Sequence, residues 1–320
     1  MFFFASLAFS RLYTTAADEK SFLSWMRSTS NIYTGDEYHL RFGIFLATKN
    51  YVNQFNSNSK SFKLTLNKFA CYTPAEINML YGIVTPFTLK GRKVSPKHEP
   101  TEVPDNFDYR DKGYVNLVRD QFLCGGCWAF SAIQAHETTD AIHTGKLLSL
   151  SESNLIDCAN IECYGCNGGW ADKGLLYVIQ NQKGQFCLLS DYQYRPYQQL
   201  CQFDSMPHYS SISDVQFIPS DEENMKIHIA TVGALSVAID ASQASFMLYD
   251  QGIYDDPKCT KGLYNHAVGV IGYGVDKESG KDYWIVRNSW GLSWGEEGYV
   301  RFLRGSDTCN IADAACYSIY

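Results

Sequence analysis

The most informative part of the chain is a short run of cysteines and glycines, QFLCGGCWAFS, at residues 121–131. Two consecutive glycines allow the backbone to turn tightly, and a helical pattern begins at the second cysteine, Cys127. A thiol at the N-terminus of a helix lies at the positive end of the helix dipole, which favours the thiolate and nucleophilic attack. The run therefore predicts a nucleophilic cysteine at position 127.

Two alternative readings of this run involve paired thiols. Cys124 and Cys127 have the CxxC spacing of a redox pair, and Cys163 and Cys166 form a second CxxC, so four thiols are available for a zinc site. The separation between the two pairs is longer than is usual for such zinc sites. A thioredoxin-type pair should follow a strand, and no strand pattern precedes Gln121. Both alternatives are therefore disfavoured, and no metal is expected.

A nucleophilic thiol needs a base and a group that orients the base. NHAVGV at residues 265–270 and RNSWG at residues 287–291 each belong to a strand-like run. They place His266 and Asn288 about 140 and about 160 residues after Cys127. The signature of papain and the cathepsins, C-G-[SA]-C-[WY], expects a His and an Asn about 130–150 residues downstream. Asn288 lies somewhat beyond that distance, and a Gly stands at the Ser/Ala position of the signature.

From Ser21 to Tyr320 the chain resembles the papain-like cysteine peptidases, and among them the cathepsin L-like group. The resemblance implies an α+β, papain-like fold with a helical lobe, a β-rich lobe and a cleft between them, preceded by a helical propeptide. It also implies a cysteine endopeptidase that is made as an inactive zymogen and needs no cofactor. The motifs that carry it are the run at 121–131, CNGG at 166–169, NHAVGVIGYG at 265–274 and NSWGLSWGEEGY at 288–299.

The resemblance assigns a role to each residue of the catalytic set. Cys127 is the nucleophile, and His266 is its proton partner. Asn288 orients the imidazole through a hydrogen bond, and Trp290 shields that bond from water. Gln121 donates its amide to the oxyanion. Because all five positions are intact, a non-catalytic binding protein of the same fold is disfavoured, as is a Cys-rich metal module.

In relatives, the pocket for the second residue before the scissile bond decides specificity. None of the matching positions carries a charge, and Ala314 lies at the floor of the pocket. An uncharged pocket is expected to prefer an apolar residue over a basic one. Asp313 is the nearby acid that would change this preference if its carboxylate turned into the pocket. The residues implied in substrate binding are Gly168, Gly169, Trp170, Ala171, Ala238, Tyr264, Trp290 and Ala314.

Eleven cysteines are many for a reducing compartment and indicate disulfide bonds. Sequence alone does not determine which cysteines pair. A Cys163–Cys187 bridge stays open, Cys316 has no assigned partner, and Cys71 lies in the N-terminal part. The pairs that the resemblance implies are Cys124–Cys166, Cys158–Cys201 and Cys259–Cys309.

Charge divides the chain into two modules. Residues 1–102 carry 12 Lys/Arg and 7 Asp/Glu, whereas residues 103–320 carry 15 and 27, so the modules should attract. Residues 85–104 hold four Pro and no apolar periodicity, which predicts a linker. We expect a signal peptide at 1–15, an inhibitory propeptide at 16–102 and the peptidase domain at 103–320. Acid should weaken the attraction, because carboxylates lose charge near their ordinary pKa of about 4.

The first module resembles the inhibitory propeptides of this group in two motifs. The ERFNIN helix motif has Thr48 in place of its first Asn, and Val52 in place of Ile. In the second motif, Thr65 and Cys71 occupy the Gly and Asp positions, so an acid-triggering role of that Asp is in doubt. The matching residues are Glu37, Arg41, Phe45, Val52, Asn56, Asn67 and Phe69.

Apolar periodicity predicts the secondary structure in outline. Helices are expected around 38–55 and 21–26 in the first module, and at 127–143 and 170–182 in the second. A helix-rich half followed by a strand-rich half predicts α+β organisation. Short β-branched or aromatic runs predict strands at 232–239, 266–273, 283–287 and 299–303.

The expected location and partners follow from the termini and the charge. The first ten residues, MFFFASLAFS, are uncharged and too short to span a bilayer, which is typical of the apolar core of a signal peptide; a buried terminal element is the alternative. We therefore expect a lysosomal or secreted protein without a stable membrane anchor. A net charge of −7 gives no support for nucleic-acid binding. The expected partners of this monomer are protein and peptide substrates and its own propeptide.

Overall fold

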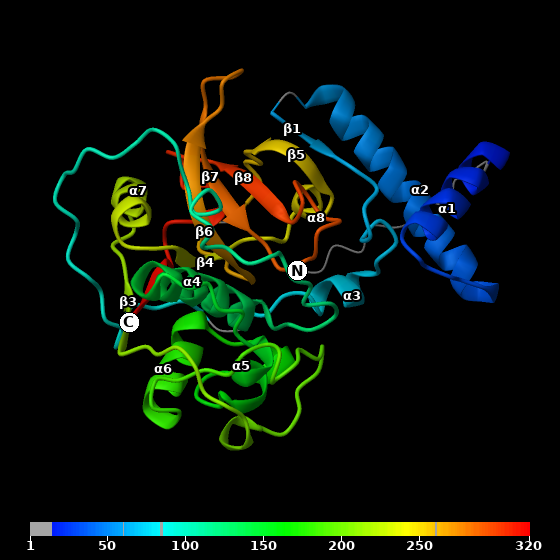
Figure 1. Ribbon diagram of the computed structural model, residues 1–320. Coiled ribbons are helices and arrows are strands. Elements are labelled where there is room, and N and C mark those ends of the chain that lie inside the picture. Colours follow the sequence, from blue (N-terminus) through cyan, green and yellow to red (C-terminus); the bar gives the residue numbers. More distant parts are fainter. Residues whose placement is uncertain (1–14, 60, 84–85, 260) are drawn as a thin grey trace.

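Helices and strands separate into a projecting N-terminal part and a two-lobed body (Figure 1). The computed structural model describes residues 15–59, 61–83, 86–259 and 261–320. Nearly all of the expected signal peptide at 1–15 lies outside these residues. The body has a helical lobe and a β-rich lobe, so the predicted α+β fold is confirmed. Within the described ranges, no helix combines the length and apolarity that a membrane crossing requires.

Two helices form the projecting part, and an aromatic cluster holds them together. Thr15 and Asp18 form a capping box, which explains why the first helix begins at residue 16 rather than near 21. Phe22 is fully buried between the helices, with its ring centroid 5.2 Å from that of Phe45. The elements of this part are α1 (Ala16–Ser28), α2 (Gly35–Asn58), β1 (Phe62–Leu64) and α3 (Pro74–Asn78).

An ion pair ties α2 to α3. Arg41 Nη1 lies 2.5 Å from Glu76 Oε2 and donates to the Cys71 carbonyl at 2.8 Å. The hydrogen bond from Arg41 lowers the pKa of Glu76 from 4.5 to about 2. Burial raises the pKa of the Cys71 thiol to about 12. Arg41 therefore binds the backbone carbonyl oxygen of Cys71. The Asp that usually occupies this position of the second propeptide motif would add a negatively charged side chain.

A long buried helix, α4, forms the centre of the body. Fourteen of its 18 residues are buried, because it packs between the strand β6 and the helix α6. The predicted helices at 127–143 and 170–182 are confirmed within one residue at each end. The elements of the helical lobe are α4 (Cys127–Thr144), α5 (Glu152–Cys158), η1 (Gly165–Asn167), α6 (Ala171–Asn181) and η2 (Phe203–Ser205). Figure 1 shows α4, α5 and α6 gathered on one side of the sheet.

The β-rich lobe is built on one mixed sheet. Its strand order is β1-β5-β8-β7-β6-β4-β9-β3, with β2 also paired to β6. The described elements of this lobe are β2 (Phe107–Asp108), β3 (Asp214–Phe217), α7 (Glu222–Thr231), β4 (Leu235–Ile239), α8 (Ala244–Met247), β5 (Tyr249–Tyr254), β6 (His266–Val275), β7 (Asp282–Arg287), β8 (Tyr299–Leu303), η3 (Thr308–Asn310) and β9 (Cys316–Ile319).

The N-terminal part extends this sheet with a strand of its own. β1 pairs antiparallel with β5, with Phe62 opposite Gly252. Gly252 has a φ of +102°, and a Cβ there would lie 2.7 Å from the Phe62 Cα. Only glycine fits this position, because the strand from the N-terminal part approaches the backbone so closely. The N-terminal part is thus joined to the body by backbone hydrogen bonds as well as by side chains.

Three of the four predicted strands have nearly the expected bounds, and the fourth is shorter. The strand expected at 232–239 begins only at Leu235. The helix α7 ends at Thr231, so residues 232–234 connect it to the strand. The N-cap of α7, Asp221, accepts hydrogen bonds from two backbone amides of its first turn. The elements β3, β5, β9 and α7 were not expected. The strands β3 and β9 alternate in burial but have only four residues each, which is too short for a clear period.

Three disulfides stabilise the body, and they are the three pairs that the resemblance implies. Two lie in the helical lobe and one in the β-rich lobe. Among the described residues the five remaining cysteines are free and buried, so the open alternative of a Cys163–Cys187 bridge does not form. The bonds are Cys124–Cys166, Cys158–Cys201 and Cys259–Cys309.

The proline-rich linker lies against the body. The amide of Phe217, the last residue of β3, donates to the Lys93 carbonyl at 2.8 Å, and its carbonyl accepts from the Ser95 amide at 2.8 Å. Farther on, Lys97 Nζ lies 2.8 Å from Asp221 Oδ2 at the start of α7. Figure 1 shows this segment as the teal trace that loops around α7. The linker is therefore held by contacts with the second module, residues 103–320, which it connects to the N-terminal module.

Candidate active site

Cys127 is the first residue of α4 and is completely buried. Its N-cap is Gly126, so the thiol lies at the positive end of the helix dipole as expected. Burial nevertheless raises the pKa of Cys127 from 9.0 to about 11, against the opposing effect of backbone amides that contact the sulfur. One of these amides belongs to Gly82 of the N-terminal module. The expectation that Cys127 is a ready thiolate is therefore wrong for this form of the chain. Residues 80–83, called the covering segment below, exclude water from the sulfur.

His266 and Asn288 lie together beneath a tryptophan. His266 begins β6, and Asn288 follows the last residue of β7. His266 Nε2 lies 2.8 Å from Asn288 Oδ1, and both residues are fully buried. The indole of Trp290 covers the imidazole at a centroid distance of 4.7 Å. Burial lowers the pKa of His266 from 6.5 to about 4, so the imidazole is neutral here.

Gln121 lies within reach of the same centre. Its Nε2 donates to the carbonyl oxygens of Leu80 and Cys124, each at 2.8 Å. Ser289 Oγ donates to Gln121 Oε1 at 2.6 Å, which fixes the orientation of the amide. Leu80 belongs to the N-terminal module. The amide that the resemblance assigns to the oxyanion thus already binds a carbonyl oxygen of the covering segment.

The covering segment crosses the site as an extended backbone. The Gly169 amide donates to the Gly82 carbonyl at 2.8 Å. On the other side, the amides of Gly82 and Ile83 both donate to the Asn265 carbonyl, at 3.1 and 3.2 Å. A Cβ on Gly82 would lie 2.9 Å from Cys127 Sγ. Residues 80–83 therefore lie directly beside the Cys127 thiol, between Gly169 and Asn265.

Several residues expected in the specificity pocket line one pocket, and a residue of the covering segment lies in it. Four of its expected residues, Trp170, Ala171, Ala238 and Ala314, line one pocket together with Ile83. The space left beside Ile83 is only about 10 Å³. Such a volume holds no more than one water molecule, so the isoleucine side chain fits the pocket closely.

The remaining residues that were expected to bind substrate surround this pocket or lie farther away. Gly169 contacts the covering backbone, and Gly168, with a φ of +108°, forms the turn before it. Tyr264 is at the rim, with its ring 6.3 Å from that of Trp170. Trp290 is not in the pocket but lies over the histidine.

An acidic side chain lines the pocket, which the sequence reasoning missed. Asp172, in the first turn of α6, lines the same pocket, as do Phe217 and Cys316. Its side chain is 2% exposed and forms an ion pair with Arg92 of the linker at 2.8 Å. The expectation of an uncharged pocket is therefore wrong. The acid that had been considered, Asp313, instead accepts a hydrogen bond from Tyr264 Oη at 2.9 Å.

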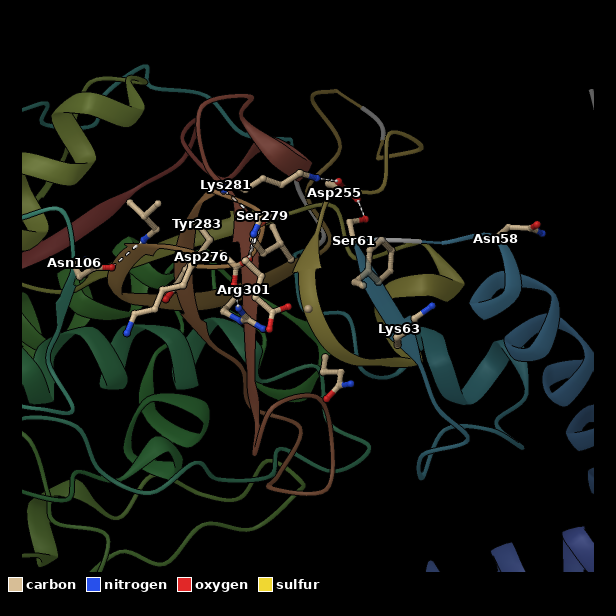
Figure 2. A pocket seen from close by; sticks show the side chains of 17 residues that line it. Asn58, Ser61, Lys63, Asn106, Asp255, Asp276, Ser279, Lys281, Tyr283 and Arg301 are labelled. Atoms are coloured by element: carbon tan, nitrogen blue, oxygen red, sulfur yellow. Dashed lines mark hydrogen bonds and ion pairs between the residues drawn. The ribbon is translucent and has the colours of Figure 1, made fainter.

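A large open hollow lies elsewhere. It measures about 1110 Å³ and lies where β1 meets β5 and the hairpin between β6 and β7. Figure 2 shows Asp255 in this hollow, between Ser61 Oγ at 2.6 Å and Lys281 Nζ at 3.0 Å. The hollow has no residue of the catalytic set. The catalytic cleft is not an open hollow because residues 80–83 fill it.

The zinc alternative conflicts with the observed cysteine chemistry. Cys124 and Cys166, two of the four thiols that it requires, form a disulfide. In the described part of the chain, no group of three or more His, Cys, Asp or Glu is arranged to hold a metal ion.

Family models match both modules. Residues 103–319 match the model of the papain family cysteine proteases, and residues 22–77 match the cathepsin propeptide inhibitor domain. The chain is 38% identical to fruit bromelain of Ananas comosus over 307 residues, covering 93% of this chain and 85% of that protein. It is 40% identical to cathepsin L of Sarcophaga peregrina over 278 residues, covering 83% of this chain and 81% of that one.

Solved precursor structures have the same fold as the whole chain. The digestive procathepsin L2 proteinase from the larval midgut of Tenebrio molitor superposes with a TM-score of 0.87 at 30% identity, covering 95% of this chain and all of that one. A recombinant stem bromelain precursor gives 0.85 at 34% identity, covering 95% of this chain and 99% of that chain. The chain therefore belongs to the papain family of cysteine proteases and carries a cathepsin-type propeptide inhibitor domain.

Proposed function

We propose that this cysteine protease is an endopeptidase that cleaves peptide bonds through an acyl-enzyme on Cys127. The observation that supports this most directly is the enclosure of three groups in one buried site: the thiol at the start of α4, the His266–Asn288 pair and the Gln121 amide. Each of them contacts, or lies beside, the backbone of residues 80–83. A substrate backbone in the same place would meet the same groups.

In the proposed reaction, His266 takes the thiol proton and the sulfur attacks the carbonyl carbon of the scissile bond. The resulting oxyanion accepts hydrogen bonds from Gln121 Nε2 and from the backbone amide of Cys127. His266 then gives the proton to the leaving amine as the C–N bond breaks, which leaves a thioester. Water attacks the thioester, transfers its proton to His266 and releases the acid, and the proton returns to sulfur. Asn288 holds the imidazole in the required orientation throughout.

The chain described here is the inhibited zymogen. Residues 16–102 act as the propeptide, and residues 103–320 as the peptidase domain, with processing between residues 85 and 103. Inhibition rests on three features: Gly82 covers the thiol, Leu80 occupies Gln121, and Ile83 fills the pocket. The propeptide is thus the first partner of the site.

An apolar side chain is accepted at the second position before the scissile bond. Ile83 supports this, because it occupies a pocket walled by Trp170 and three alanines. Burial of such a side chain is favourable by about 25 cal/mol per Å² of apolar surface. We further propose a monomer that acts on proteins and peptides after export, either lysosomal or secreted, with residues 1–15 as the signal peptide.

The test is to label the processed enzyme with a thiol-directed epoxide and to map the label by mass spectrometry. Cys127 alone should react, and Cys127→Ser should lose turnover by at least about 1000-fold, because the alkoxide is far harder to form than the thiolate. In the unprocessed zymogen, labelling should be slow and should rise with pH up to about 11, the pKa of the covered thiol.

A matched control is Cys187→Ala, which removes another buried free thiol and should retain turnover. Substantial turnover in Cys127→Ser, or equal labelling of Cys187, would place the nucleophile elsewhere.

A further inference from the structure

One residue that lines the specificity pocket, Asp172, holds the guanidinium group of Arg92, which lies in the linker. Arg92 donates from Nε to Asp172 Oδ2 at 2.8 Å and from Nη2 to Asp172 Oδ1 at 3.3 Å. A third donor, Nη1, binds the Thr88 carbonyl. The carboxylate thus receives the two-pronged contact that suits a guanidinium.

Aromatic rings complete this site. The Arg92 guanidinium carbon lies 5.2 Å from the ring of Trp170 and 5.4 Å from that of Phe217, both in the peptidase domain. Phe87, in the linker, contributes a third ring at 5.2 Å. The Arg92 side chain is 6% exposed, so the contact is desolvated. Cation–π contacts of this kind are strongest away from water.

Processing after Arg92 removes the cation and leaves the carboxylate. Among the described residues, Arg92 is the one cation recorded in an ion pair with Asp172. The next basic residue along α6, Lys173, pairs with Glu162 at 2.6 Å. When the nearly buried Asp172 carboxylate loses Arg92, it favours the binding of any positively charged side chain.

We propose that Asp172 determines specificity in the processed enzyme, so that the pocket accepts arginine or lysine as well as apolar side chains. The inference rests on the endopeptidase function proposed above and extends its substrate class. Ile83 and Asp172 line the same pocket. In this proposal, a longer basic side chain in place of Ile83 brings its cation to the carboxylate, where it replaces Arg92 beside Trp170 and Phe217.

The experiment uses processed enzyme whose N-terminus has been shown by mass spectrometry to lie after Arg92. Fluorogenic peptides carry norleucine before the scissile bond and Leu, Arg or citrulline at the second position. Citrulline has nearly the shape of arginine without its charge. We expect the specificity constant for Arg to be within about tenfold of that for Leu and at least tenfold above that for citrulline, the range of discrimination that a buried polar contact provides.

The variant Asp172→Asn should lower the Arg/Leu ratio by at least about 30-fold, because its amide cannot pair with the cation. Asp313→Asn, which changes the neighbouring acid, should keep the wild-type ratio. As a measurement independent of turnover, N-acetylarginine amide should compete with the Leu peptide more strongly than N-acetylcitrulline amide does, and only in enzyme that retains Asp172.

The outcomes separate the two proposals. If Leu is cleaved but Arg is no better than citrulline, or if Asp313→Asn rather than Asp172→Asn changes the ratio, the role of Asp172 is wrong and the endopeptidase function stands. If neither the Leu nor the Arg peptide is cleaved and no thiol is labelled, the endopeptidase function itself fails.

Discussion

Gly82 determines how closely the backbone of residues 80–83 approaches the Cys127 thiol. Gly82 lies between Gly169 and Asn265, to which its carbonyl and amide are hydrogen-bonded. A Cβ at this position would be 2.9 Å from Cys127 Sγ and would overlap the Gly125 carbonyl. Real Cβ atoms do not approach other atoms so closely. The thiol is covered completely only because residue 82 has no side chain.

We expect Gly82→Ala to weaken inhibition. The added methyl must push residues 80–83 out of the cleft, which admits water and lowers the pKa of Cys127 from about 11 toward its ordinary value. Processing of the full chain at constant pH should be about tenfold faster, which corresponds to roughly 1.4 kcal/mol. The half-time of processing on a gel measures this.

The matched control is Gly43→Ala in the middle of α2, where an added Cβ meets nothing within 4 Å. That change should stabilise the helix by up to about 1 kcal/mol and should not accelerate processing. Equal acceleration in both variants would show that Gly82 acts through propeptide stability rather than through the thiol.

At the scale of elements, the propeptide is held together where α2 meets α3. Glu76 closes the capping box of α3 with Thr73 and also receives Arg41 from α2. The Arg41 side chain is 11% exposed and that of Glu76 is 24% exposed, so the pair is largely protected from water. One carboxylate therefore orients two helices.

We expect Glu76→Gln to destabilise the propeptide by about 2 kcal/mol, because a partly buried arginine loses its charged partner. The folded-state pKa of Glu76, about 2, lies below its ordinary 4.5, so its contribution is complete above pH 4.5 and is lost as the pH falls toward 2. Denaturant unfolding of the full chain, followed by Trp25 fluorescence, should show this loss at pH 7 and a smaller one near pH 2.5. An equal difference at both pH values would contradict the assignment.

At the scale of the whole molecule, basic side chains of the propeptide face acidic side chains of the peptidase domain. Besides the Arg92–Asp172 pair, Lys68 lies 2.5 Å from Asp120 and Lys93 lies 2.7 Å from Asp214. Lys93 lowers the pKa of Asp214, which therefore keeps its charge in mild acid. These ion pairs fit the expected attraction between the modules, and protonation of a carboxylate with a lowered pKa weakens it only in stronger acid.

A histidine pair is better placed to sense mild acid. His98 of the linker has its Nε2 3.1 Å from His228 Nδ1 on α7. Burial, and secondarily the nearby His98, lower the pKa of His228 from 6.5 to about 3. Docking of the linker therefore requires that the imidazole of His228 is neutral. It is strongest above pH 6.5 and weakens as the pH falls below that value, by up to about tenfold per unit.

We expect His98→Gln to shift acid-triggered processing of the full chain to lower pH by about 0.5–1 unit, because glutamine keeps a hydrogen-bonding group but lacks the ring that, after burial, helps to lower the pKa of His228. Lys97→Gln, on the same segment, removes an exposed ion pair worth at most about 1 kcal/mol and should leave the midpoint almost unchanged. The midpoint is read from processing rates between pH 4 and pH 7. A shift in Lys97→Gln that matches the one in His98→Gln would mean that the pair is not the trigger.

Local sequence predicted the residues proposed for catalysis and the main helices. The run at 121–131 places Cys127 at a helix start because Gly-Gly followed by an apolar helical pattern leaves few other conformations. The motifs around His266 and Asn288 are contiguous, and the resemblance they carry implied the disulfide pairs that the structure contains. These features depend on neighbours along the chain or on a family pattern, which is why they were visible without a structure.

Only the tertiary structure decided the pKa of Cys127 and which residues of the N-terminal part and the linker occupy the site. In sequence, Asp172 reads as an ordinary acid in the first turn of a helix, and Arg92 as one of several cations in a linker. Folding brings these two side chains, 80 residues apart, into one desolvated contact. In the same way, Gly82 changes the pKa of Cys127 only because the chain returns across the cleft. Burial and partnership depend on distant segments that fold against one another, and no local pattern encodes which segments those are.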